Sequence, residues 1–113
     1  MGELARIEAE CSGDRCVVRI RGEIDISNAA EVAREIEQSI ASDCSQVVVD
    51  LAATAYLDSS GISILIRLAE RLRATRQRMQ LVVPEDSPIR GIVELTALPQ
   101  VMPVATHLPD LTG

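Results

Sequence analysis

An α/β fold in one domain, with a mostly parallel sheet and one antiparallel edge strand, is the architecture that the sequence predicts. Two strand-like segments open the chain, and strand-like and helix-like segments then alternate to its end. This order gives a parallel sheet whose first strand joins as an antiparallel edge. A length of 113 residues suits one domain with its own core. We expect a central sheet of about five strands with helices packed against it.

The first two segments predict a β-hairpin at the edge of the sheet. Residues 3–11 alternate weakly, and residues 16–22 alternate aliphatic residues with arginine, as half-buried strands do. The Ser-Gly-Asp-Arg sequence between them has turn chemistry. Gly22 is expected to end the second strand, and residues 23–27 are expected to form a short loop.

The next segments predict a helix and a central strand. Apolar residues at helical spacing after residue 28 predict an amphipathic helix of about three turns. Ser27 or Asn28 is expected to cap it, and Glu31 is placed for a capping box. Residues 46–51 read Gln-Val-Val-Val-Asp-Leu, a continuous apolar run that is typical of a strand buried on both faces.

The second half of the chain predicts four further elements. They are a long helix from Ser60, a buried strand over 79–84, a shorter helix over 86–98 and a final strand over 100–105. Asp86 or Ser87 is the expected cap of the shorter helix, with Pro88 in its first turn. The domain is expected to cover residues 4–108, and residues 109–113 are expected to form a C-terminal tail.

The composition argues against several classes of function. The chain has no Phe or Trp, one tyrosine, a net charge of −6 and a pI near 4.7, which together argue against nucleic-acid binding. All eleven basic residues are Arg, so lysine chemistry is not available. The single histidine, His107, is expected to be a solvated tail residue. We therefore expect no metal site and no cofactor.

Cysteine usage and the N-terminal sequence indicate a cytoplasmic setting. The chain has three cysteines and no Cys-x-x-Cys sequence, and Glu3 and Arg6 are unlike a secretory leader. No apolar run approaches the length of a membrane span. The simplest expectation is free thiols in a reducing compartment. Cys11 and Cys16 flank the predicted turn and could face each other, so a redox pair is a minority alternative.

The segment Asp58-Ser59-Ser60-Gly61 interrupts two apolar runs and allows three interpretations. The simplest is structural: these residues are the standard chemistry of a helix N-terminus, and Gly61 permits a close approach. Catalysis is the second interpretation, but a serine nucleophile needs a base, and His107 is remote in sequence. Asp25 and Asp58 alone do not make a substrate site, so we expect no enzyme activity.

A modification site is the third interpretation. A hydroxyl fixed at a helix N-terminus and exposed at a sheet edge can accept a phosphoryl group, which adds roughly two negative charges. Any partner docked there through apolar contacts would then face a buried dianion, at a cost of about several kcal/mol. The segment is therefore suited to be a contact that phosphorylation switches off.

The sequence resembles the STAS domain family, of the anti-sigma factor antagonist (anti-anti-sigma factor) type. The resemblance is carried by Gly-Glu-Ile-Asp at 22–25, Val-Val-Val-Asp-Leu at 47–51 and Tyr-Leu-Asp-Ser-Ser-Gly-Ile at 56–62. Asp-Ser-Ser-Gly alone is a weak motif, and its combination with the two other segments in this order makes the resemblance specific. The matching segments extend over nearly the whole chain, so the resemblance implies a STAS-like fold.

The resemblance also implies a partner-switching cycle in bacterial transcription. The unmodified protein would bind an anti-sigma factor that is a serine kinase, and so release a sigma factor. The kinase would phosphorylate Ser59 and end the complex, and a metal-dependent serine phosphatase would restore it. The implied partner-binding rim comprises Asp25, Asp58, Ser60, Gly61 and Ile62. The alternative is a scaffold module of a stressosome-like or lipid-transport complex in which Ser59 is not switched.

Overall fold

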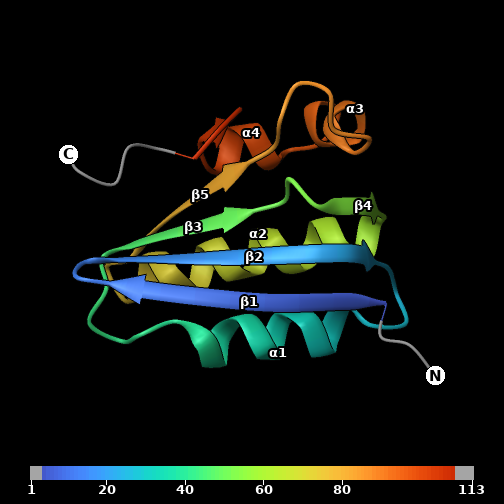
Figure 1. Cartoon of the computed structure of the whole chain (residues 1–113). Helices are drawn as coiled ribbons and strands as arrows, with labels where there is room; N and C mark the ends of the chain where they lie inside the picture. The colour runs from blue at the N-terminus through green and yellow to red at the C-terminus, as the bar shows by residue number, and fades with distance from the viewer. Residues whose placement is uncertain (1–3, 109–113) are drawn as a thin grey trace.

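A six-stranded sheet forms the centre of the molecule (Figure 1), in a computed structural model that describes residues 4–108. The elements are β1 (Ala5–Ser12), β2 (Arg15–Ile24), α1 (Ala29–Ser39), β3 (Gln46–Asp50), β4 (Thr54–Leu57), α2 (Ser59–Ala74), β5 (Arg78–Val82), α3 (Arg90–Glu94), α4 (Leu98–Val101) and β6 (Val104–Ala105). The strand order is β1-β2-β3-β5-β6, with β4 paired to β2. Within this described part, β1 and β2 pair antiparallel and the other pairs are parallel. The predicted fold class is confirmed, and β4 is an additional strand.

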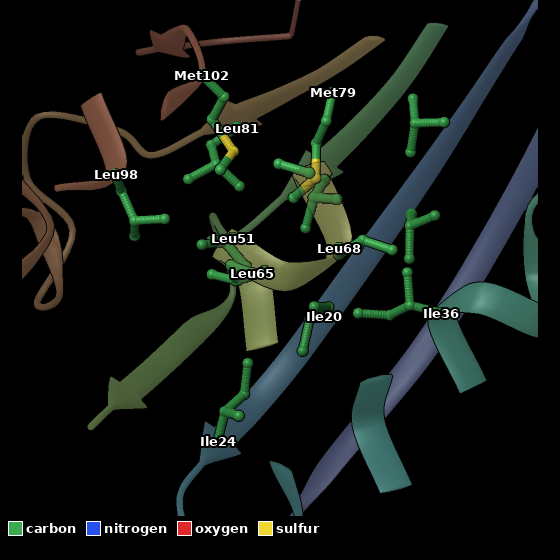
Figure 2. Packing of buried hydrophobic residues seen from close by; sticks show 14 of the residues in the cluster. Ile20, Ile24, Ile36, Leu51, Leu65, Leu68, Met79, Leu81, Leu98 and Met102 are labelled. Atoms are coloured by element: carbon green, nitrogen blue, oxygen red, sulfur yellow. The ribbon is translucent and has the colours of Figure 1, made fainter. Parts of the chain in front are cut away.

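Aliphatic side chains fill the space between one face of the sheet and the helices α1 and α2 (Figure 2). Ile20 and Leu81 of the sheet, Ile36 of α1 and Leu65 of α2 are all fully buried. Each such side chain contributes about 1.5–3 kcal/mol by leaving water. Tyr56 is half exposed, so this core contains no aromatic ring. None of the helices within residues 4–108 is long and apolar enough to cross a membrane.

The opposite face of the sheet carries a smaller apolar cluster. Val17, Val48 and Val82 from three adjacent strands are buried there, and Leu108 packs against them. The central strand β3 is therefore buried on both faces, as its valine run predicts. Charged side chains surround this cluster, and Arg19 Nε lies 3.7 Å from Asp50 Oδ2.

The predicted hairpin is confirmed, but the expectation of three free thiols is wrong. Gly13 occupies the first position of the two-residue turn with φ of 57°, a conformation that glycine adopts without cost. The tight turn makes Cys11 and Cys16 direct partners across β1 and β2, and a disulfide joins them. Cys44 is a free, buried thiol.

Gly22 does not end β2, contrary to the sequence prediction. The strand continues to Ile24 and changes its neighbour from β3 to β4, with an irregular register between Gly22 and Glu23. Gly22 has φ of 108°, and a Cβ there would lie 2.2 Å from the Leu4 carbonyl oxygen. Where the pairing changes, the buried Thr54 hydroxyl donates to the Ile20 carbonyl oxygen at 2.7 Å. This bond satisfies an acceptor that a continuous ladder would have paired.

The C-terminal third differs most from the predicted helix over 86–98. Asp86, Ser87 and Pro88 lie in turns, and Ile89 is the N-cap of the short helix α3. The helix stops because the Thr96 hydroxyl bonds the Val93 carbonyl oxygen and accepts from Leu98 N–H.

A separate helix, α4, then begins at Leu98 with Pro99 in its first turn, and it covers part of the segment predicted as a strand. Of the predicted strand over 100–105, only β6 forms. Leu95, which lies within the predicted helix segment, is 89% exposed.

The long helix α2 ends in a Schellman motif. Gln77 N–H donates to the Leu72 carbonyl oxygen at 2.7 Å, and Arg76 N–H donates to the Arg73 carbonyl oxygen at 3.1 Å. The motif requires a left-handed residue between them, and Arg76 takes that place with φ of 64°. A side chain with a Cβ pays about 1–2 kcal/mol for this conformation.

Arg76→Gly is therefore expected to stabilise the protein by about 1 kcal/mol, because glycine adopts the left-handed region without the Cβ clash. Glu70→Gly, at an exposed position inside the same helix, is the control and should destabilise it by about 1 kcal/mol. Urea unfolding followed by circular dichroism measures both. A loss of stability in both variants would contradict the strain at Arg76.

Candidate functional site

Two neighbouring strands, β2 and β4, end side by side and carry the candidate site. Ile24 and Leu57 are register partners in this parallel pair. The segments that follow them, residues 25–28 and 58–62, are called the rim below. The predicted strand over 46–51 does not run into Asp58 directly, because β4 lies between them. Asp25 and Ser59 lie at the same edge of the sheet, because Asp25 directly follows Ile24 and Asp58 and Ser59 follow its partner Leu57.

Asp58 joins the two halves of the rim. Its Oδ1 accepts hydrogen bonds from Ser60 N–H at 2.9 Å and Gly61 N–H at 3.1 Å, so it is the N-cap of α2. Its Oδ2 accepts from Ile26 N–H at 3.2 Å, in the connection between β2 and α1. One carboxylate therefore caps a helix and fixes a loop that is remote in sequence.

The loop between β2 and α1 closes on the side chains of Asp25 and Asn28. Asp25 Oδ1 accepts from both the N–H and the hydroxyl of Ser27, and the hydroxyl bond is the main reason that the pKa of Asp25 lies below its ordinary value. Asn28 accepts from Asp25 N–H and donates to the Glu23 carbonyl oxygen. Asn28 lies at the N-cap position of α1 but makes no cap bond there, so the capping box with Glu31 is wrong.

Ser59 is the first residue of α2 and its side chain is exposed. Its hydroxyl makes no hydrogen bond with any residue in the described range 4–108. Ser60, the next residue, is half-buried. Within the described residues, Ser59 therefore begins α2 with an exposed hydroxyl that holds no hydrogen bond.

Gly61 and Ile62 are the buried part of the rim. Both are buried, and Ile62 is 8% exposed. A Cβ on Gly61 would lie 2.4 Å from Leu57 Cδ1 and 3.1 Å from Ile24 Cγ2, so glycine allows α2 to approach the two strand ends closely. Of the predicted rim residues, Asp25, Asp58 and Ser60 keep partial exposure.

Two exposed apolar side chains and a groove complete the surroundings. Ile26 is 82% exposed and Tyr56 is 49% exposed. A groove of about 660 Å³ runs between α1 and α2 from Ile26 and Ser60, and Arg34 and Arg67 line it. Ile26 was not among the predicted site residues, although an isoleucine inside a polar loop was a usable signal. No pattern in the sequence predicts the groove, because its shape depends on how α1 and α2 pack against each other.

Comparison with known proteins finds a matching family model and several similar proteins. The family model of the STAS domain matches residues 6–111. The anti-sigma-F factor antagonist RsfB of Mycobacterium tuberculosis is 32% identical over 99 residues, which are 86% of this chain and 79% of that protein. A crystal structure of an anti-sigma factor antagonist from Mycobacterium paratuberculosis has a TM-score of 0.81 and 27% identity, covering 92% of this chain and 87% of that one.

A more distant structural likeness concerns the fold alone. The anti-sigma factor antagonist SpoIIAA in its unphosphorylated form has a TM-score of 0.70 at 21% identity, covering 90% of each chain.

Asp58→Ala is expected to destabilise the protein by about 1–2 kcal/mol, because the first turn of α2 and the Ile26 amide lose their acceptors. Asp58→Asn should destabilise the protein less than Asp58→Ala does, since the amide oxygen can still cap the helix. Urea unfolding measures the stability, and amide hydrogen exchange at Ile26, Ser60 and Gly61 locates the change. Asp43→Ala, at an exposed aspartate remote from the rim, is the control. Equal effects of the Asp43 and Asp58 changes would contradict the cap.

The carboxyl group of Asp25 is expected to titrate below 3.8, its ordinary value. A lowered pKa in the folded state gives stability that is present above the ordinary value and is lost as the pH falls through the folded value. Ser27→Ala should raise the midpoint of the Asp25 titration, because it removes the hydrogen bond from the Ser27 hydroxyl. Ser42→Ala should leave that midpoint unchanged. A ¹³C carboxyl titration by NMR measures it. Identical midpoints in wild type and Ser27→Ala would exclude the hydroxyl as the cause.

Proposed function

The chain belongs to the STAS domain family, and from this we propose that it is an anti-sigma factor antagonist that phosphorylation at Ser59 switches off. In the unmodified state it binds an anti-sigma factor serine kinase and so releases a sigma factor. The kinase phosphorylates Ser59, and a metal-dependent serine phosphatase reverses the modification. The protein is the substrate in this cycle and acts in the cytoplasm.

The observation that carries the proposal is the setting of the Ser59 hydroxyl. It is exposed and has no hydrogen-bond partner among residues 4–108, and it belongs to the first residue of α2, directly after the N-cap Asp58. A kinase active site can therefore receive this hydroxyl without breaking a hydrogen bond of the protein. The kinase supplies the base, ATP and Mg²⁺ that the phosphoryl transfer needs.

A phosphoryl group at this position would meet opposing influences. The amino end of α2 favours a negative charge. However, the Asp58 carboxylate already holds the N–H groups of Ser60 and Gly61. Asp58 and Asp25 would also repel the phosphate. The added charge would therefore be compensated only in part by the protein itself.

The surface around Ser59 would make this charge costly in a complex. Ile26 of the rim and Tyr56, just before it in β4, expose apolar area. A partner that covers these side chains excludes water from Ser59, and a dianion left there without a counter-charge costs about several kcal/mol. In this proposal Asp25, Asp58 and Ser60 contact or border the partner. Gly61 and Ile62, the buried residues of the rim, hold the exposed ones in place.

The deciding experiment incubates the protein with each candidate anti-sigma serine kinase of its own genome and ATP, and maps the phosphate by mass spectrometry. Phosphate on Ser59 and its loss in Ser59→Ala are expected, while Ser60→Ala should still accept phosphate on Ser59. If every kinase fails to modify Ser59, the proposal is wrong and an unswitched scaffold role becomes the better account.

Binding variants test the charge directly. Ser59→Ala should bind the kinase with the affinity of the unphosphorylated wild type. Ser59→Asp should bind the kinase with an affinity lower by roughly tenfold or more. Isothermal titration calorimetry measures both affinities. Ser42→Asp adds the same charge at an exposed position beyond the other end of α1 and should have little effect. Equal binding by Ser59→Asp and Ser59→Ala would show that charge at this position is not the switch.

A further inference from the structure

We propose that Cys11 and Cys16 form a reversible disulfide, a modification site whose exchange partners are the dithiols of other proteins. The site lies at the hairpin end of the sheet, whereas the rim lies at the opposite end (Figure 1). β2 connects the two, from Arg15 beside the turn to Ile24 at the rim. The inference concerns a second site and does not depend on the proposed function of Ser59.

The two cysteine residues differ in exposure. Cys11 is exposed on the edge strand β1, and Cys16 is fully buried in the core. An attacking thiolate can therefore reach the Cys11 sulfur while Cys16 is screened by the protein. This asymmetry fixes which sulfur is attacked and which one leaves.

The fold also accommodates the reduced state. Cys11 Sγ lies 3.6 Å from the carbonyl oxygen of Ser39, the last residue of α1. That oxygen is at a helix C-terminus, where carbonyl groups lack helical partners. A Cys11 thiol would thus find an acceptor after reduction. Cys16 would remain a small buried thiol among aliphatic side chains.

The disulfide contributes less to the fold than a typical structural disulfide. It joins residues only five apart in sequence, and the stabilisation from closing a loop grows with its length. The hairpin is also held by strand pairing from Ala5–Gly22 to Ser12–Arg15. Because the strands stay paired without the bond, reduction should leave a folded protein.

The exchange balances with one dithiol. A thiolate of the dithiol attacks the Cys11 sulfur, the Cys11–Cys16 bond breaks, and Cys16 leaves as a thiolate and takes a proton. The second thiol of the reagent then attacks the reagent sulfur that is bonded to Cys11 in the mixed disulfide. Cys11 leaves as a thiolate and takes a proton. Two electrons and two protons pass to the protein, and the reagent leaves as a disulfide. The reverse sequence, starting from an oxidised dithiol, restores the bond.

The third cysteine is an internal control. Cys44 is buried, and Gln77 Nε2 lies 3.6 Å from its sulfur. Burial is the main reason that its pKa is raised, and the nearby Asp43 and Asp14 carboxylates add to the effect. The thiolate is the reactive form, so Cys44 should stay inert while the other two cysteines exchange.

The test equilibrates the folded protein in mixtures of reduced and oxidised dithiothreitol, and in a second arm with reduced thioredoxin. Acid quenching, alkylation of thiols in denaturant and peptide mass spectrometry then count free thiols at each cysteine. We expect Cys11 and Cys16 to convert together and fully in both directions, with Cys44 always reduced. Native alkylation after reduction should label Cys11 much faster than Cys16.

Stability provides a second readout. Reduction should lower the melting temperature by about 5–10 °C while the circular dichroism spectrum stays native. Cys11→Ser should melt like the reduced protein and lose the response to dithiothreitol, and Cys44→Ala should keep that response. The proposal is overturned if excess dithiothreitol leaves the native bond intact, if oxidation pairs Cys44 instead, or if reduction unfolds the chain. Reduction by dithiothreitol but not by thioredoxin would overturn the assignment to protein dithiols.

Discussion

The arrangement of the rim depends on the Asp58 carboxylate. Its two oxygen atoms bind Ser60 and Gly61 N–H on one side and Ile26 N–H on the other. These three donors belong to a helix start and a connecting loop, which have no strand or helix partner of their own. The exposure of Ser59 follows, because the residue next to the cap is placed at the first turn with its side chain outside.

Close packing below the carboxylate completes the arrangement. Gly61 brings α2 against Leu57 and Ile24, the last residues of the two paired strands. Any larger residue there would move the helix start away from the strand ends, and the distance from Asp58 to the loop would change with it. Asp58 and Gly61 thus fix the position of the helix start against the strand ends and the loop. The hydroxyl of Ser59, between them, makes no hydrogen bond within residues 4–108.

The sequence predicted elements whose pattern is local and long enough. The valines of β3 and the apolar stripe of α2 were sufficient, because burial repeats along each element. The strand β4 has four residues and only its first and last are buried, so it carries no recognisable pattern. The second bond of Asp58 joins positions 32 apart, and the side chain of Asn28 turns to the loop instead of the helix. Such choices depend on tertiary neighbours.

The break between β3 and β4 also divides the sheet into parts of unequal cooperativity. β4 is paired with β2 alone, through Gly22, Glu23 and Ile24, whereas β3 is paired on both sides. Opening β4 and the first turn of α2 would leave the ladders of β2, β3 and β5 intact, so it would cost only part of the global unfolding free energy. An enzyme that must draw a hydroxyl of this segment into its own active site would work against this smaller local free energy.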